Sequence, residues 1–226
     1  MTDKILDEVW SKIRLLLKSH PWHGVPIGKN VPVNVTTYIE IVPTDTVKYE
    51  IEKHSGFLKV DRPQKYSNVC PTPYGFIPQT LCGDKAAEYC MKMTGRKNVK
   101  GDNDPLDICV ITEKSISHSN ILLQAIPIGG LRMIDNDEAD DKIIAVMKDD
   151  AIFSEWRDIG DCSHSFIERL KHYFLTYKDA PGSEGKRCEI HSIYGKSEAY
   201  EVISACHEDY LKKYSDLNSL LNREEI

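Results

Sequence analysis

The chain has 226 residues, of which 41% are hydrophobic and 28% are charged, and its formal net charge is −6. This length supports a buried core without disulfide bonds, and the mixed composition is typical of an ordinary globular protein. A net acidic chain has no general electrostatic attraction to nucleic acid, whose binding depends on neutralising phosphates.

The N-terminal 20 residues carry apolar side chains at helical spacing, interrupted by charged ones. This pattern predicts an amphipathic helical extension over residues 1–20 rather than a secretory signal, which needs a continuous apolar stretch. No run in the chain approaches the roughly 18 apolar residues of a membrane helix. The seven cysteines are odd in number and form no CxxC pair, so we expect reduced thiols in a cytoplasmic protein.

Residues 33 to 150 are predicted to form mainly strands and loops. Residues 47–52 alternate apolar and charged side chains, and the turn at 54–56 leads into a second apolar run, which predicts a hairpin. Further strands are predicted over 38–41, 108–111, 121–126 and 143–146.

From about residue 160 onward the apolar spacing becomes helical. Phe166, Leu170, Tyr173, Phe174 and Tyr177 share one helix face, and a second helix is predicted around 199–210. Short strands followed by helices indicate an α+β, mainly β protein: a small, closed or nearly closed β-barrel flanked by α-helices.

An acidic run lies directly before the predicted strand 108–111. Asp102, Asp104 and Asp107 supply three carboxylates around Pro105, which fixes the local backbone. Hard divalent cations prefer carboxylate oxygens held in this way. On its own, such a run is more often a solvated loop or an Asx-turn than a metal site. A calcium loop of the EF-hand type fits poorly, because Leu106 takes the place of an oxygen ligand.

A second acidic cluster, over residues 135–142, also precedes a predicted strand. Five carboxylates in so short a segment repel one another unless they are solvated or bound to cations. If the two acidic loops meet in space, they can hold more than one metal ion. Lysine, arginine and tyrosine side chains elsewhere could bind phosphoryl oxygens; the candidates are Lys48, Arg62, Tyr74, Tyr177 and Lys178.

Taken in order, these motifs resemble the soluble, family I inorganic pyrophosphatases. The run 102–108 is similar to the family signature, and the segments 39–41, 48–50, 60–62, 74–78, 135–146 and 177–178 continue the likeness. The resemblance extends over about residues 33 to 210. It implies one domain spanning 1–226, an OB-like barrel, and hydrolysis of inorganic diphosphate to two phosphates by a Mg²⁺-activated water without a covalent intermediate.

The resemblance also implies roles for individual residues. Asp104 matches the general base on the attacking water, and Asp107 matches a ligand shared by two Mg²⁺ ions. The implied metal-binding residues are Asp102, Asp107, Asp140, Asp135, Glu40 and Glu50, the last two acting through metal-bound water. The implied substrate-binding residues are Lys48, Arg62, Tyr74, Lys142, Tyr177 and Lys178.

The sequence departs from the family pattern at three places: Cys70 replaces a common tyrosine, residues 83–100 form a loop insertion, and residues 1–20 extend the N-terminus. The resemblance implies a homo-oligomer, either hexamer or dimer, with no nucleic acid or membrane as partner.

Two other functions are open to test. One is a non-catalytic module that binds nucleic acid or calcium, which the acidic balance disfavours. The other is a glycosidase-like carboxylate pair, for which the surplus of acidic and cationic residues is poorly suited.

Overall fold

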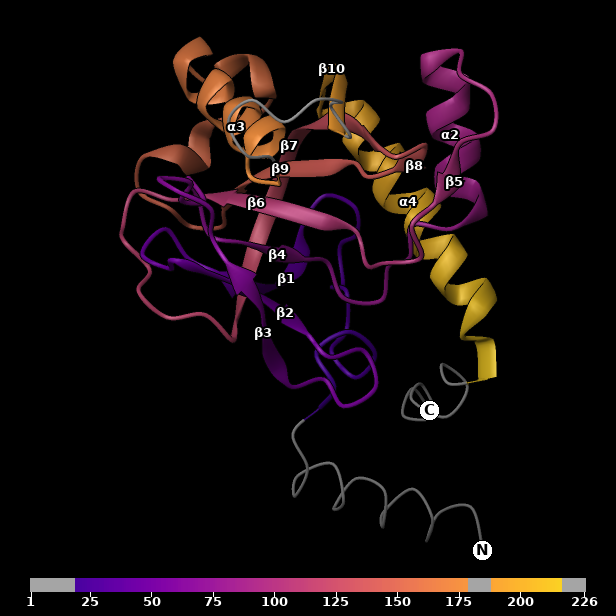
Figure 1. Cartoon of the computed structure of the whole chain (residues 1–226), viewed down its shortest axis with the longest axis horizontal. Helices are drawn as coiled ribbons and strands as arrows, with labels where there is room; N and C mark the ends of the chain where they lie inside the picture. Colours follow the sequence, from indigo (N-terminus) through magenta and orange to yellow (C-terminus); the bar gives the residue numbers. More distant parts are fainter. Residues whose placement is uncertain (1–18, 179–187, 217–226) are drawn as a thin grey trace, which may run out of the picture.

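A computed structural model describes residues 19–178 and 188–216 of the chain (Figure 1). The predicted N-terminal helix over 1–20 falls almost entirely outside these residues. The strands are β1 (Val35–Ile41), β2 (Val47–Ile51), β3 (Leu58–Pro63), β4 (Tyr74–Phe76), β5 (Lys100–Gly101), β6 (Asp107–Ile111), β7 (Ile121–Asp135), β8 (Glu138–Ala139), β9 (Lys142–Met147) and β10 (Cys188–Gly195). The helices are α2 (Asp84–Thr94), α3 (His164–Thr176) and α4 (Lys196–Lys213), with 3₁₀ turns η1 (Phe153–Glu155) and η2 (Ile159–Asp161).

The strands confirm the predicted barrel. Pairing runs β1–β4–β6–β9–β7, and β7 pairs with β1 as well, so the ring closes. Long β7 makes this possible because its first half pairs with β1 and its middle with β9, with an irregular register between Pro127 and Gly129. The close approach of β4 to β1 requires Gly75, where an added Cβ would lie 1.9 Å from the backbone oxygen of Tyr38.

Alternate residues of the central strands enter two different cores. Ile108 and Ile143 pack in a cluster with Val202 and Ile203 of α4. Cys109 and Ile144 pack in a second cluster, which includes Phe174 of α3. The strands β6 and β9 are therefore buried on both faces, which explains their continuous apolar sequences. Figure 1 shows α3 on one side of the strands and α2 with α4 on the other.

Two segments differ from the sequence prediction. Residues 83–100, expected as a loop, contain the helix α2, which buries Ala87 and Cys90 and ends at Gly95 in the left-handed conformation (φ 70°). Residues 188–195, within the part expected to be helical, form β10 against the second half of β7. By contrast, α3 follows its prediction, and the Ser163 hydroxyl caps it by accepting a hydrogen bond from the Phe166 backbone.

Within the described part of the chain, no helix is both long and apolar enough to cross a membrane.

Candidate active site

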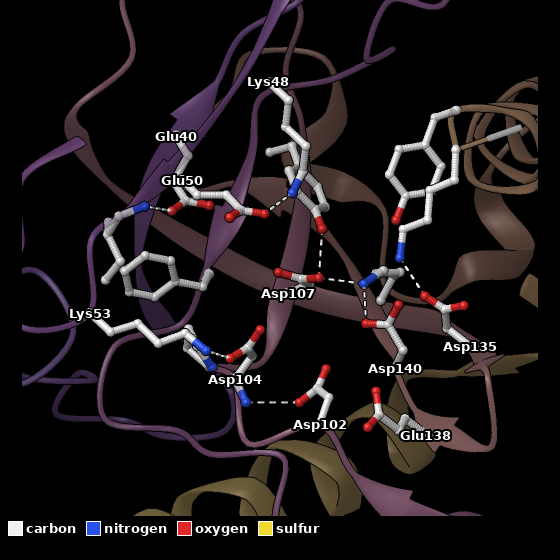
Figure 2. Close-up of a pocket in the computed structure, with 17 residues that line it drawn as sticks. Glu40, Lys48, Glu50, Lys53, Asp102, Asp104, Asp107, Asp135, Glu138 and Asp140 are labelled. Carbon is white, nitrogen blue, oxygen red and sulfur yellow. Dashed lines mark hydrogen bonds and ion pairs between the residues drawn. The ribbon is translucent and has the colours of Figure 1, made fainter. Parts of the chain in front are cut away.

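Carboxylates and lysines from several strands meet in one pocket (Figure 2). The pocket has a volume of about 200 Å³, smaller than the roughly 300–1,000 Å³ of sites for drug-sized organic ligands. Its size and charge therefore suit a small ion. It is lined by twelve of the thirteen predicted site residues: Glu40, Lys48, Glu50, Tyr74, Asp102, Asp104, Asp107, Asp135, Asp140, Lys142, Tyr177 and Lys178.

The parallel pairing of β6 with β9 creates the centre of this pocket. The register places Asp107 opposite Lys142, at the first position of each strand. The Lys142 ammonium pairs with the carboxylates of both Asp107 and Asp140, while its side chain is almost completely buried. Tyr74 from β4 donates its hydroxyl hydrogen to Asp107 Oδ2 at 2.6 Å. The two acidic loops thus meet in space, which the sequence alone had left open.

The loop that carries Asp104 is fixed by its own backbone. Asp104 N donates to Asp102 Oδ1 at 2.8 Å, and Asn103 between them adopts a left-handed conformation (φ 60°). The Asp104 carbonyl accepts a hydrogen bond from Cys82 N at 2.8 Å. An Asx-turn was one interpretation of this run in isolation, and here that turn holds the carboxylate of Asp104 at the pocket wall (Figure 2).

Buried negative charge dominates the electrostatics of the pocket. Burial, together with the neighbouring Asp140 carboxylate, raises the pKa of Asp102 to about 8. Burial also raises the pKa of Asp140 itself and that of Glu40, the latter to about 8. Glu40 is held by a 2.7 Å hydrogen bond from Ile51 N. A cation among these carboxylates would favour their charged forms.

The donor set fits a hard divalent cation, because Asp102, Asp107 and Asp140 offer carboxylate oxygens only. Among the residues that the structure describes, no three such side chains are arranged around a common metal position. Instead the Lys142 ammonium lies between Asp107 and Asp140, and Lys178 pairs with Asp135. Lysine charge therefore offsets part of the negative charge of the acidic side chains in this arrangement.

Arg62 is the one predicted residue that does not line the pocket. Its guanidinium lies 5.6 Å from the centre of the Tyr177 ring and pairs with Asp61. Its buried Nη2 makes no hydrogen bond to any residue of 19–178 or 188–216. Arg62 is therefore adjacent to the pocket through Tyr177 and retains a donor for a further oxygen.

Two charged residues of the pocket wall, Lys53 and Glu138, were not predicted from the sequence. Glu138 belongs to the second acidic cluster and could have been assigned from it. Lys53 pairs with Asp104 across 51 positions of sequence, so no local signal could have found it. Cys70, which replaces a tyrosine common in the family pattern, is completely buried and does not line the pocket.

The acidic cluster also contains a residue that points elsewhere. Asp141, next to Asp140, accepts two hydrogen bonds on Oδ2 from Arg132, at 3.2 Å (Nε) and 3.0 Å (Nη2), and a third from the Tyr194 hydroxyl at 3.1 Å. Arg132 is fully buried. Asp141 therefore belongs to the core rather than to the pocket.

Known proteins resemble this chain in sequence and in fold. The profile of the family described as inorganic pyrophosphatase matches residues 37–211. The inorganic pyrophosphatase of Chlamydia caviae is 54% identical over 199 residues, covering 86% of this chain and 92% of its own. The soluble inorganic pyrophosphatase of Zea mays is 33% identical over 201 residues, with 88% and 84% covered. The crystal structure of the Thermus thermophilus inorganic pyrophosphatase superposes with a TM-score of 0.70 at 27% identity, covering 84% of this chain and 98% of that one.

Proposed function

Because the chain belongs to the inorganic pyrophosphatase family and is an inorganic diphosphatase, we propose that it hydrolyses pyrophosphate with Mg²⁺ and an activated water, without a covalent intermediate. The observation that carries the proposal is the convergence of Asp102, Asp107 and Asp140 with lysine side chains in one small pocket. A diphosphate repels an anionic nucleophile, so its hydrolysis needs concentrated positive charge.

Asp102, Asp107 and Asp140 would hold the principal Mg²⁺, with Asp135 contributing to metal that enters with the substrate and Glu40 and Glu50 acting through bound water. When bound, Mg²⁺ neutralises the diphosphate and lowers the pKa of a water molecule toward neutrality. The raised pKa values of Asp102 and Asp140 support this assignment, because divalent charge would compensate their burial.

The side chains of the protein then accept the proton of the water and bind the two phosphates. Asp104 orients the attacking water and accepts its proton. Lys142 and Lys178 each contact carboxylates through a single ammonium, which can rotate onto a phosphate oxygen when the carboxylates bind metal. Lys48, Arg62, Tyr74 and Tyr177 supply further donors to the two phosphates, stabilising the leaving group.

The direct test is release of phosphate from pyrophosphate with saturating Mg²⁺ and after removal of metal with a chelator. We expect turnover that requires the metal. Absence of phosphate release at saturating Mg²⁺ would contradict the proposal, and tight oligonucleotide binding without hydrolysis would favour a binding module instead.

We also propose a homo-oligomer, either hexamer or dimer, located in the cytoplasm, on the basis of the family resemblance. Light scattering coupled to size-exclusion chromatography separates the two oligomers, and a monomer would contradict both.

A further inference from the structure

Residues 19–24, at the end of the N-terminal extension and directly after it, pack against the turn that carries Lys53. Nε2 of His20 lies 3.2 Å from the backbone oxygen of Lys53. The same segment is anchored to the barrel by Trp22, which is buried and donates its indole hydrogen to the Thr80 carbonyl at 2.8 Å. Gly24 N closes the segment by bonding to the His20 carbonyl at 2.8 Å. Contacts within its own segment thus hold His20 in place, independently of its contact with Lys53.

The contacts of His20 define which ring nitrogen carries the hydrogen. Nδ1 accepts hydrogen bonds from Trp22 N at 3.2 Å and His23 N at 3.4 Å, so this nitrogen is unprotonated. The hydrogen therefore lies on Nε2, which donates it to the Lys53 carbonyl. Burial lowers the pKa of His20, in keeping with a neutral ring.

The turn packs closely against the His20 ring at Gly56. Gly56 has φ +70°, and a Cβ at that position would lie 2.7 Å from Cδ of Pro21 and 2.9 Å from Cδ2 of His20. Within the turn, the Glu52 carboxylate accepts hydrogen bonds from the backbones of His54, at 3.3 Å, and Ser55, at 2.8 Å. These hydrogen bonds define the conformation of the turn, and His20 attaches the turn to the segment that Trp22 anchors.

The ammonium of Lys53 pairs with Oδ1 of Asp104 (Figure 2). Both side chains are about half exposed, at 52% and 46%. An exposed ion pair between flexible side chains contributes little by itself, because ordering the lysine costs entropy. Fixing the Lys53 backbone reduces the entropy lost when its ammonium is placed on Asp104. The His20 contact fixes this backbone at its carbonyl oxygen.

We propose that His20 is a positioning residue for pyrophosphate hydrolysis, holding Lys53 so that its ammonium fixes the Asp104 carboxylate toward the attacking water. This role rests on the proposed function, in which Asp104 is the general base. The ion pair uses Oδ1, so the second carboxylate oxygen is the one available to accept the proton. The N-terminal extension thereby contributes to the rate of a reaction carried out by the barrel.

Two substitutions separate this role from a merely structural one. The side-chain nitrogen of His20→Gln can replace Nε2 and donate to Lys53, whereas the oxygen of His20→Asn can replace Nδ1 and cap Trp22 N. We expect His20→Asn to lower kcat about fivefold with KM within about twofold, and His20→Gln to retain most of the activity. The opposite ranking, with Asn active and Gln impaired, would overturn the proposal.

His23→Ala is the matched control, because His23 lies in the same segment but contacts the Tyr210 hydroxyl at 3.0 Å rather than Lys53. We expect it to lower the Tm without lowering kcat. Equal loss of kcat in His20→Asn and His23→Ala would show general loosening and overturn the proposal.

Lys53→Met keeps the inference testable even if a His20 variant folds poorly. We expect this variant to lower kcat about tenfold, and we expect His20→Asn to add no further loss in its background. Additive losses, or an effect on KM alone, would overturn the positioning role. An inactive wild type with saturating Mg²⁺ would instead contradict the proposed function itself, so the two failures are distinguishable.

Discussion

Two neighbouring aspartates show how the same chemistry serves two purposes in this molecule. Burial raises the pKa of both Asp140 and Asp141, and both are paired with cations. Asp141 meets the planar guanidinium of Arg132, whose two nitrogens bond to its carboxylate, and Asp140 meets the single ammonium of Lys142. A forked contact fixes geometry, whereas a point charge can be exchanged for another cation.

The surroundings of the two cations sharpen the contrast. Arg132 also pairs with Glu198 at 2.9 Å and lies 5.2 Å from the centre of the Tyr89 ring and 4.9 Å from that of Tyr194. Lys142 instead divides its charge between Asp107 and Asp140 at the wall of an open pocket. We infer that the first cluster maintains the fold and the second performs the chemistry.

The largest expected effect is on kcat, from a substitution in the pocket cluster around Lys142. Asp107→Ala should lower kcat by about 10³-fold and weaken Mg²⁺ binding, because it removes the carboxylate that the family resemblance assigns to two metal ions. Phosphate release and calorimetric titration with Mg²⁺ measure both effects. A variant that retained full turnover would remove Asp107 from the site.

Substitutions in the buried cluster around Arg132 should lower the stability of the fold rather than kcat. Arg132→Met leaves Asp141 and Glu198 without their buried partner, and we expect it to lower the free energy of unfolding by about 3 kcal/mol. Arg96→Met is a suitable control, since its partly exposed pair with Glu189 should contribute under about 1 kcal/mol. Urea unfolding measures both, and equal losses would argue against a special role for the buried cluster.

Asp104→Asn tests the division of labour inside the pocket. The amide keeps the size of the side chain but cannot take a proton, so we expect kcat to fall by about 10²-fold with metal affinity largely retained. Steady-state kinetics and a Mg²⁺ titration measure the two quantities separately. Unchanged kcat would show that Asp104 is not the base.

The smallest effect, counted per pH unit, concerns the dependence of stability on pH. The pKa of Glu40 is about 8 in the folded protein because of burial, against an ordinary 4.5. Between these values the folded state retains a proton that the unfolded state has lost, so stability should decrease as pH rises, by up to about 1.4 kcal/mol per unit. Urea unfolding of metal-free protein from about pH 5 to pH 9 measures this slope. Glu40→Gln should reduce the slope, while the raised pKa values of Asp102 and Asp140 account for the remainder; an unchanged slope would exclude Glu40 as a contributor.

Much of the fold follows from local sequence. The strands β6 and β9 were predictable because both faces are buried, and α3 because its apolar positions repeat at helical spacing. The segment β10 was not, since its mixed side chains become a strand only by pairing with the distant end of β7. The helix α2 over residues 84–94 was not predicted, because the inserted segment was assumed to be a loop.

The site shows the same limit. The carboxylates could be found because they cluster within two short loops before strands. Lys53 and His20 could not, because each contributes through a contact between parts of the chain far apart in sequence. Closure of the barrel likewise depends on β1 and β7 pairing over a long separation.

Comparing Asp140→Asn with Asp141→Asn tests the central claim most directly, because the two changes are chemically identical and adjacent. We measure kcat with saturating Mg²⁺ and the free energy of unfolding for each. Asp140→Asn should lose about 10²-fold or more in kcat and little stability, whereas Asp141→Asn should lose stability and keep most of its kcat. Equal effects of both substitutions on rate and stability would contradict the separation of a chemical from a structural cluster.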